Sequence, residues 1–271
     1  MKKPIGIFDS GVGGLTVYKA IRSAFPKEDL IYFGDTARVP YGPKSHNTII
    51  EYSVQNARFL LQKGIKILIV ACNTSSAVAL QDLEALTDIP IIGVIGPGAE
   101  MAAKLTRSKR IGVIGTEGTV RSEAYSRAIS EILPEAEVFS QACPLFVPLV
   151  EEGWLDHPVT RLTAQEYLKP ILAEHTDTLV LGCTHYPLLK SLLQDIVGTA
   201  MKLVDSAEAM ADITAGLLQQ QGLALGAGVV LPLPTGQCPI AFTWEIVDYL
   251  AGQSAQRCGP CRNGLPALAA E

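Results

Sequence analysis

Short apolar runs alternate with longer amphipathic segments along most of the chain. The runs are rich in Ile, Val and Leu, which is typical of buried strands. They lie at residues 4–8, 29–33, 66–71, 91–95, 110–114, 136–140, 178–181 and 201–204. Between them, apolar residues recur three and four positions apart, which predicts helices at residues 15–25, 45–63, 75–86, 119–133 and 187–197.

Alternation of strands and helices predicts an α/β fold, with a mainly parallel sheet flanked by helices on both faces. Two helix ends carry recognisable signals. Gly64 follows a predicted helix, where glycine is favoured as a C-terminal cap. Pro187 begins another, where proline suits the first turn.

The strand-helix pattern occurs twice. Residues 5–10 open one unit and residues 111–116 open a similar one, with Tyr18 and Tyr125 at similar places on the following helices. Later, one apolar run leads into Cys72 and another into Cys183. The repeat predicts two pseudo-symmetric α/β lobes with a site in the cleft between them. A chance match between two common α/β patterns is the alternative.

The repeat also predicts the domain organisation. We expect a first lobe at residues 1–95 plus 206–250 and a second lobe at residues 96–205, with a turn at residues 96–98 between them. Residues 251–271 are rich in Gly, Pro and Ala, which predicts a flexible tail. In folds of this class, ligands bind at the carboxyl ends of the strands.

Composition narrows the class of protein. Only 18% of residues are charged, below the roughly 25% of an average soluble domain, so the chain has ample material for buried cores. No apolar run reaches the roughly 18 residues of a membrane span, and the N-terminus does not look like a signal peptide. A cytoplasmic protein is expected. The net charge of −5, without a basic block, argues against a nucleic-acid partner.

Cysteines are the main candidates for chemistry. In a cytosolic chain they are expected to be thiols, and their spacing with histidine matches no metal site. Cys72 and Cys183 each follow a predicted strand and precede a helix. A helix N-terminus lowers the pKa of a thiol. One such cysteine is usually just a small buried hydrophobe, but two in equivalent lobes are expected to face each other across the cleft.

A facing pair of thiols can form a disulfide or can move a proton. In the second case one thiolate removes a proton from a carbon, and the opposite thiol returns one from the other side. This is racemisation or epimerisation, and it requires well-placed, desolvated bases. Asp9 is a candidate auxiliary group for the first lobe, and His185 and Glu151 (paired with Glu152) for the second. Asp9 could instead cap a turn, and neighbouring glutamates often mark a solvated helix face.

The glycines at residues 11–14 do not complete a dinucleotide-binding or phosphate-binding motif. They are better explained by a close approach of the backbone to a small carboxylate at the start of a helix. Thr116 and Thr119 occupy the equivalent loop of the second lobe.

Four motifs in order resemble glutamate racemase. They are Asp9-Ser10-Gly11-Val12-Gly13-Gly14-Leu15-Thr16, Gly34-Asp35-Thr36-Ala37-Arg38-Val39-Pro40-Tyr41-Gly42, Ala71-Cys72-Asn73-Thr74 and Gly182-Cys183-Thr184-His185-Tyr186-Pro187. The match runs through residues 4 to 210. The resemblance implies interconversion of L- and D-glutamate without pyridoxal phosphate, metal or other cofactor. It also implies a homodimer that supplies D-glutamate for peptidoglycan and the cell wall.

The resemblance also implies roles for individual residues. Cys72 and Cys183 match the two acid/base thiols, and Asp9, Glu151 and His185 match the groups that support them. The expected substrate contacts are Asp9, Ser10, Pro40, Tyr41, Gly42, Asn73, Thr74, Thr116, Thr119, Thr184 and His185.

Three alternatives remain open on the sequence. An aspartate or hydantoin racemase would share the chemistry and differ in the pocket. A thiol-disulfide oxidoreductase would use the CxxC pair Cys258 and Cys261, although that pair lies in the Gly/Pro/Ala-rich tail. A two-lobed binding protein would not need two thiols in its cleft.

Overall fold

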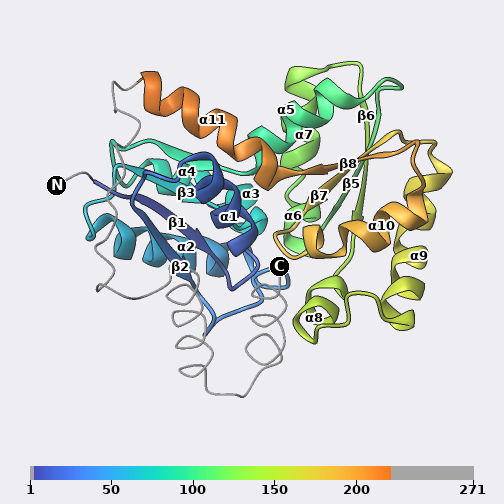
Figure 1. The fold of residues 1–271 in the computed structure, drawn as a ribbon, viewed down its shortest axis with the longest axis horizontal. Helices are drawn as coiled ribbons and strands as arrows, with labels where there is room; N and C mark the ends of the chain where they lie inside the picture. Colours follow the sequence, from blue (N-terminus) through green and yellow to red (C-terminus); the bar gives the residue numbers. More distant parts are fainter. Residues whose placement is uncertain (1–2, 221–271) are drawn as a thin grey trace.

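The computed structural model describes residues 3–220 and contains two parallel four-stranded sheets. The first has the order β2-β1-β3-β4 and the second the order β6-β5-β7-β8. The strands are β1 (Ile5–Asp9), β2 (Leu30–Gly34), β3 (Ile67–Val70), β4 (Ile91–Gly93), β5 (Arg110–Gly115), β6 (Glu137–Ala142), β7 (Thr178–Gly182) and β8 (Lys202–Asp205). Because the second sheet repeats the order of the first, the prediction of two pseudo-symmetric α/β lobes is confirmed (Figure 1).

Within each sheet, the strand that opens the repeat lies in the interior. β1 pairs with β2 and β3, and β5 pairs with β6 and β7. β1, β3 and β7 are buried along their whole length, and β5 along all but its first residue. This explains why these strands read as continuous apolar runs rather than as alternating ones. Their carboxyl ends lead directly into the candidate site.

Helices cover both sheets. They are α1 (Leu15–Ala24), α2 (His46–Leu61), α3 (Asn73–Val78), α4 (Leu80–Glu84), α5 (Ile95–Leu105), α6 (Glu117–Arg121), α7 (Ala124–Ile132), α8 (Phe146–Glu151), α9 (Pro158–Ala173), the 3-10 helix η1 (Tyr186–Leu189), α10 (Lys190–Val197) and α11 (Ser206–Gln220).

Two predicted helices are each divided in the structure. The helix expected at 75–86 begins at Asn73 and breaks at Ala79, while the one expected at 119–133 breaks before Ala124, where Glu123 has a φ of 55°. Apolar spacing continues across both breaks, so periodicity alone could not reveal them. The predicted helix-end signals fare differently. α2 ends at Leu61 and its C-cap is Gln62, so Gly64 is not the cap and instead lies in the following turn with a φ of +69°. Pro187 lies in the first turn of η1, as predicted.

The expected turn at residues 96–98 is wrong, because α5 begins at Ile95 and includes these residues. Pro97 lies in the first turn of that helix, where no backbone N–H is needed. Gly98 is explained by packing, since a Cβ there would lie 3.1 Å from the ring of Tyr125.

The cores indicate which lobe each connecting helix joins. Ile95 and Ala99 of α5 pack with Ile111 and Val113 of the second sheet. Met210 of α11 packs in the core of the first sheet, so the chain crosses back after β8 (Figure 1). The division into residues 1–95 plus 206–250 and residues 96–205 stays a prediction. The rest of the first-lobe segment 206–250 and the tail 251–271 lie outside the described residues.

Within residues 3–220, no helix has both the length and the apolar character needed to cross a membrane.

Candidate active site

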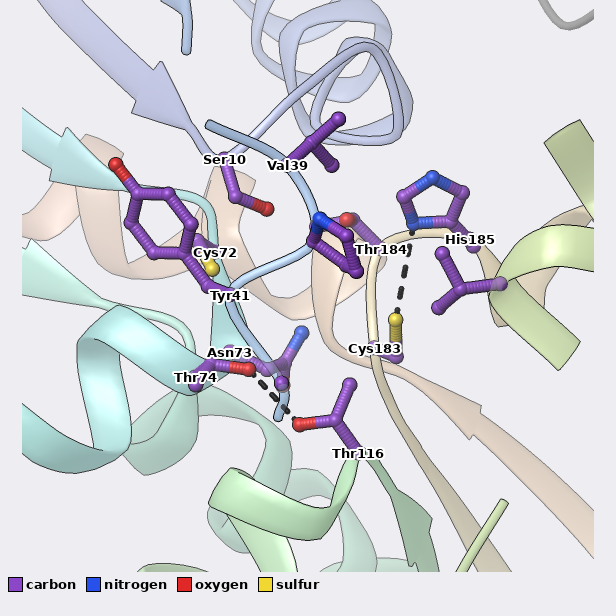
Figure 2. A pocket seen from close by; sticks show the side chains of 13 residues that line it. Ser10, Val39, Tyr41, Cys72, Asn73, Thr74, Thr116, Cys183, Thr184 and His185 are labelled. Atoms are coloured by element: carbon purple, nitrogen blue, oxygen red, sulfur yellow. Dashed lines mark hydrogen bonds between the residues drawn. The ribbon is translucent and has the colours of Figure 1, made fainter. Parts of the chain in front are cut away.

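One pocket lies between the lobes, at the carboxyl ends of the interior strands. The space between its walls is about 300 Å³ when the adjoining open solvent is included. Its lining combines loops of both lobes and consists of Ser10, Val39, Pro40, Tyr41, Gly42, Cys72, Asn73, Thr74, Thr116, Val147, Cys183, Thr184 and His185. Figure 2 shows the sulfur atoms of Cys72 and Cys183 on facing walls, one from each lobe.

Cys72 caps the N-terminus of α3 just after β3. Its Sγ accepts a hydrogen bond from the Ser75 backbone N–H at 3.5 Å. Burial and the nearby Asp9 carboxyl nevertheless raise the pKa of the Cys72 thiol to about 11, against the smaller lowering effect of the Ser75 N–H. The prediction of a lowered pKa is therefore wrong, because the thiol is 4% exposed and its loss of hydration outweighs the effect of the helix N-terminus.

Asp9 ends β1 and is completely buried. Its Oδ2 accepts hydrogen bonds from the N–H groups of Gly11 (3.0 Å) and Gly14 (3.1 Å), and its Oδ1 accepts from the Thr184 hydroxyl (3.3 Å). Burial raises the pKa of Asp9, although His185 and these donors act in the opposite direction. Asp9 therefore does cap the glycine turn, and it also lies close enough to influence Cys72.

Cys183 follows β7 and faces His185. The sulfur lies 3.8 Å from His185 Nδ1, and His185 Nε2 lies 3.2 Å from Glu151 Oε1. Burial alone would lower the pKa of His185, but its hydrogen bonds to Cys183 and Glu151 raise it to about 10. The imidazole is therefore protonated at neutral pH and can transfer a proton to the sulfur. Glu152, the sequence neighbour of Glu151, is exposed.

Hydroxyl and amide groups line the floor of the pocket. The hydroxyl of Thr74 lies 2.9 Å from that of Thr116 and 3.3 Å from that of Thr119, and the latter two are 3.1 Å apart. These contacts join the two lobes. Asn73 Nδ2 is buried and has no hydrogen-bond partner in the described part of the chain. The floor can therefore offer several donors to a carboxylate.

The loop after β2 closes one side of the pocket. Tyr41 is 1% exposed, and its hydroxyl donates to Asp35 and accepts from Asn56 Nδ2 at 3.0 Å. The Gly118 N–H donates to the Gly42 carbonyl at 2.9 Å, which ties this loop to the second lobe. A Cβ on Gly42 would lie 2.7 Å from Thr116 Cβ, so the close approach requires glycine there.

Every predicted site residue is in or beside the pocket. Asp9, Thr119 and Glu151 do not line it, but each contacts a lining residue. Sequence reasoning missed Val39 and Val147, which line the pocket, and Tyr125, whose hydroxyl donates to Asn73 Oδ1 at 2.7 Å. The first two are apolar residues without a chemical signal, and Tyr125 appeared only as part of the repeat.

The charged and metal-binding side chains of the pocket region show two features. The lining contains neither Lys nor Arg, so the protonated His185 is the one basic side chain on the pocket wall. Among the described residues, no group of three or more His, Cys, Asp or Glu side chains is placed to hold a metal ion. A bound carboxylate would rely on hydroxyls, amide N–H groups and this imidazolium.

Comparison with known proteins identifies the family to which the chain belongs. The family described as Asp/Glu/Hydantoin racemase matches residues 5–214. The chain belongs to the Asp/Glu/hydantoin racemase family. Within it, the chain is 64% identical to the glutamate racemase of Syntrophus aciditrophicus over 220 residues, covering 81% of this chain and 82% of that one. It is 60% identical to the glutamate racemase of Geobacter metallireducens over 217 residues, covering 80% of each.

Solved structures of racemases share the two-lobed arrangement. Glutamate racemase isoform RacE1 from Bacillus anthracis matches with a TM-score of 0.81 and 42% identity, covering 83% of this chain and 85% of that one. The Francisella tularensis glutamate racemase in complex with D-glutamate matches with a TM-score of 0.77 and 41% identity, covering 82% and 83%. The resemblance to glutamate racemase seen in the four sequence motifs is confirmed.

Proposed function

We propose that this protein interconverts L- and D-glutamate by moving the α-proton between Cys72 and Cys183, without metal or pyridoxal phosphate. The observation that carries the proposal is the pair of thiols on facing walls of one pocket. The relatives that are 64% and 60% identical to the chain are glutamate racemases, which supports glutamate as the substrate.

The reaction conserves protons and needs no oxidant. One sulfur, as thiolate, takes the proton from the α-carbon, which leaves the electron pair of the C–H bond on a carbanion stabilised by the adjacent carboxylate. The opposite thiol then donates its proton to the other face of the same carbon. The sulfurs have then exchanged protonation states. After the product leaves, proton exchange with water or with the neighbouring acid/base groups returns each sulfur to its starting state for the next turnover. Asp9 beside Cys72, and the His185–Glu151 pair beside Cys183, would control whether each sulfur is a thiol or a thiolate.

The substrate contacts follow from the lining. Hydroxyls of Ser10, Thr74, Thr116 and Thr184, with the amide of Asn73, would hold the carboxylates and the amino group. Pro40, Tyr41 and Gly42 would close the pocket over the substrate, since their loop is tied to the second lobe. Excluding water in this way makes the fixed donors stronger.

Loss of the circular dichroism of D-glutamate tests the activity on purified, chelator-treated and pyridoxal-free protein. The signal should decay to zero as the racemic mixture forms. D-aspartate, run in parallel, should react much more slowly. A preference for aspartate would mean that aspartate is the substrate and that the mechanism is unchanged. A protein inactive on both amino acids would refute the proposed activity and leave only the family membership.

Thiol substitutions test the mechanism. Cys72→Ser and Cys183→Ser should each lower racemisation at least 1,000-fold, on the order expected when a catalytic nucleophile or base is removed. Cys143→Ser is the matched control, because Cys143 is a buried free thiol outside the pocket lining. Exchange of the α-hydrogen in deuterated water would separate a catalyst from a two-lobed binding protein.

The setting in the cell is also proposed. A cytoplasmic location is supported by the three free thiols of the described residues, and D-glutamate made there would supply peptidoglycan synthesis. Growth of a D-glutamate auxotroph that carries this chain, without added D-glutamate, tests that role. A homodimer is implied by the resemblance to glutamate racemase, and sedimentation equilibrium would test it.

A further inference from the structure

Asn73 presents a hydrogen-bond donor that no group in the described part of the chain satisfies. Its Nδ2 is buried and has no hydrogen-bond partner within residues 3–220, and Figure 2 shows this nitrogen pointing into the pocket. Burying an N–H group without a partner costs free energy. Such a group is expected where a ligand supplies the missing acceptor.

The other end of the same amide is held from the second lobe. Asn73 Oδ1 accepts a hydrogen bond of 2.7 Å from the hydroxyl of Tyr125, which lies on α7 and is 2% exposed. The Tyr125 ring fits between two glycines, since a Cβ on Gly98 or Gly182 would lie 3.1 Å from it. The hydroxyl is therefore fixed in place, and so is the side of the amide that faces it.

The direction of the hydrogen bonds determines which end of the amide faces the pocket. Burial raises the pKa of Tyr125, so the phenol keeps its proton and donates it to Asn73 Oδ1 at 2.7 Å. With its oxygen engaged there, the amide turns its N–H groups toward the pocket.

We propose that Tyr125 is a positioning residue that orients the Asn73 amide so that Nδ2 donates to a carboxylate oxygen of the amino-acid substrate. This inference rests on the proposed function and adds a group from the second lobe to a substrate contact made by the first. A carboxylate only accepts hydrogen bonds, so an amide flipped the other way would repel it.

A double-mutant cycle tests the proposal with wild type, Tyr125→Phe, Asn73→Ala and the double variant. Tyr125→Phe keeps the ring and removes the hydroxyl. We expect KM for glutamate to rise roughly 3- to 10-fold with kcat changed less than about twofold, because the carboxylate is already negative in the bound substrate. In the Asn73→Ala background, Tyr125→Phe should leave KM unchanged within about 1.5-fold.

The internal repeat offers a matched control. Tyr18 occupies the position on α1 that corresponds to Tyr125 on α7, but its hydroxyl accepts only from Arg22 of the same helix, at 3.4 Å, among the hydrogen bonds of the described residues. Tyr18→Phe should leave KM unchanged. An unchanged KM in Tyr125→Phe, or an equal rise in the Asn73→Ala background, would overturn the proposal.

Two further measurements keep the test decisive. If Tyr125→Phe does not fold, Asn73→Ala alone should raise KM by removing the unsatisfied donor, and an unchanged KM would refute the idea. If wild type does not racemise glutamate, the proposed function fails. In that case the glutamate affinity of the same four proteins, measured by isothermal titration calorimetry, tests the role of Tyr125 instead. If the effects of Tyr125→Phe and Asn73→Ala on the affinity simply add, the role of Tyr125 is refuted.

Discussion

Replacing Gly13 with alanine should displace the imidazole that serves Cys183. Gly13 lies in the loop after β1, against the second lobe. A Cβ there would lie 2.7 Å from His185 Nδ1 and 2.7 Å from Thr184 Oγ1. Ordinary contact begins at 3.4 Å, so the ring must withdraw by about 0.7 Å. Because misplacement of a reacting group by about 1 Å can cost about 100-fold in rate, we expect kcat to fall about 10- to 100-fold.

The circular dichroism assay with D-glutamate measures this loss, and thermal unfolding checks that the variant is folded. Gly96→Ala is the matched control, because a Cβ at Gly96 on α5 has nothing within 4 Å. It should keep full activity and gain up to about 1 kcal/mol of stability from the helix propensity of alanine. A folded Gly13→Ala protein with kcat within twofold of wild type would show that the position of His185 does not limit the reaction.

Three further expectations concern the thiols, the imidazole and a turn far from the pocket. Iodoacetamide should label Cys72 and Cys183 more slowly when glutamate is present, as measured by mass spectrometry of the peptides; equal labelling would place the substrate elsewhere. The pKa of His185 is raised from 6.5 to about 10. The contribution of its protonated imidazole to the stability of the fold is therefore complete below pH 6.5 and is lost as the pH rises to 10. The urea unfolding free energies of wild type and His185→Asn should therefore differ by on the order of 3–5 kcal/mol at pH 6 and converge near pH 10; a constant gap would contradict the pairing with Glu151. Asp177→Ala should cost about 1–2 kcal/mol of stability without changing kcat, because the carboxylate accepts from the N–H groups of Arg107 and Ser108 at 2.7 and 2.6 Å; loss of activity would contradict this.

The sequence predicted the parts of the fold whose signal is local. All eight described strands overlap the predicted apolar runs. The signal is strongest for the interior strands β1, β3, β5 and β7, since a strand buried on both faces needs little besides β-branched and leucine residues. The helix α5 was missed because Gly96, Pro97 and Gly98 are typical turn residues. The helix brings Gly98 against Tyr125, a contact between distant segments that local sequence does not reveal.

The same distinction applies to the site. The place of the two thiols, Asp9 and His185 beside the pocket could be predicted because each lies at the carboxyl end of a strand. The pKa of Cys72 could not, because burial outweighs the helix N-terminus and burial is a property of the whole fold. The contacts that cross between the lobes, such as Thr74 with Thr116 and Tyr125 with Asn73, leave no mark in local sequence.

The two sheets share one strand order, yet the walls of the pocket differ. One wall carries Cys72 with Asp9 behind it, and the other carries Cys183 with His185 and Glu151. Two enantiomers have equal free energies in water, so a racemase must have the same kcat/KM in both directions, however uneven its walls. The asymmetry of this pocket can therefore appear only as kcat and KM rising or falling together. The folded chain can bind one enantiomer of the amino acid more tightly than the other, but as a catalyst it cannot shift the equilibrium toward either.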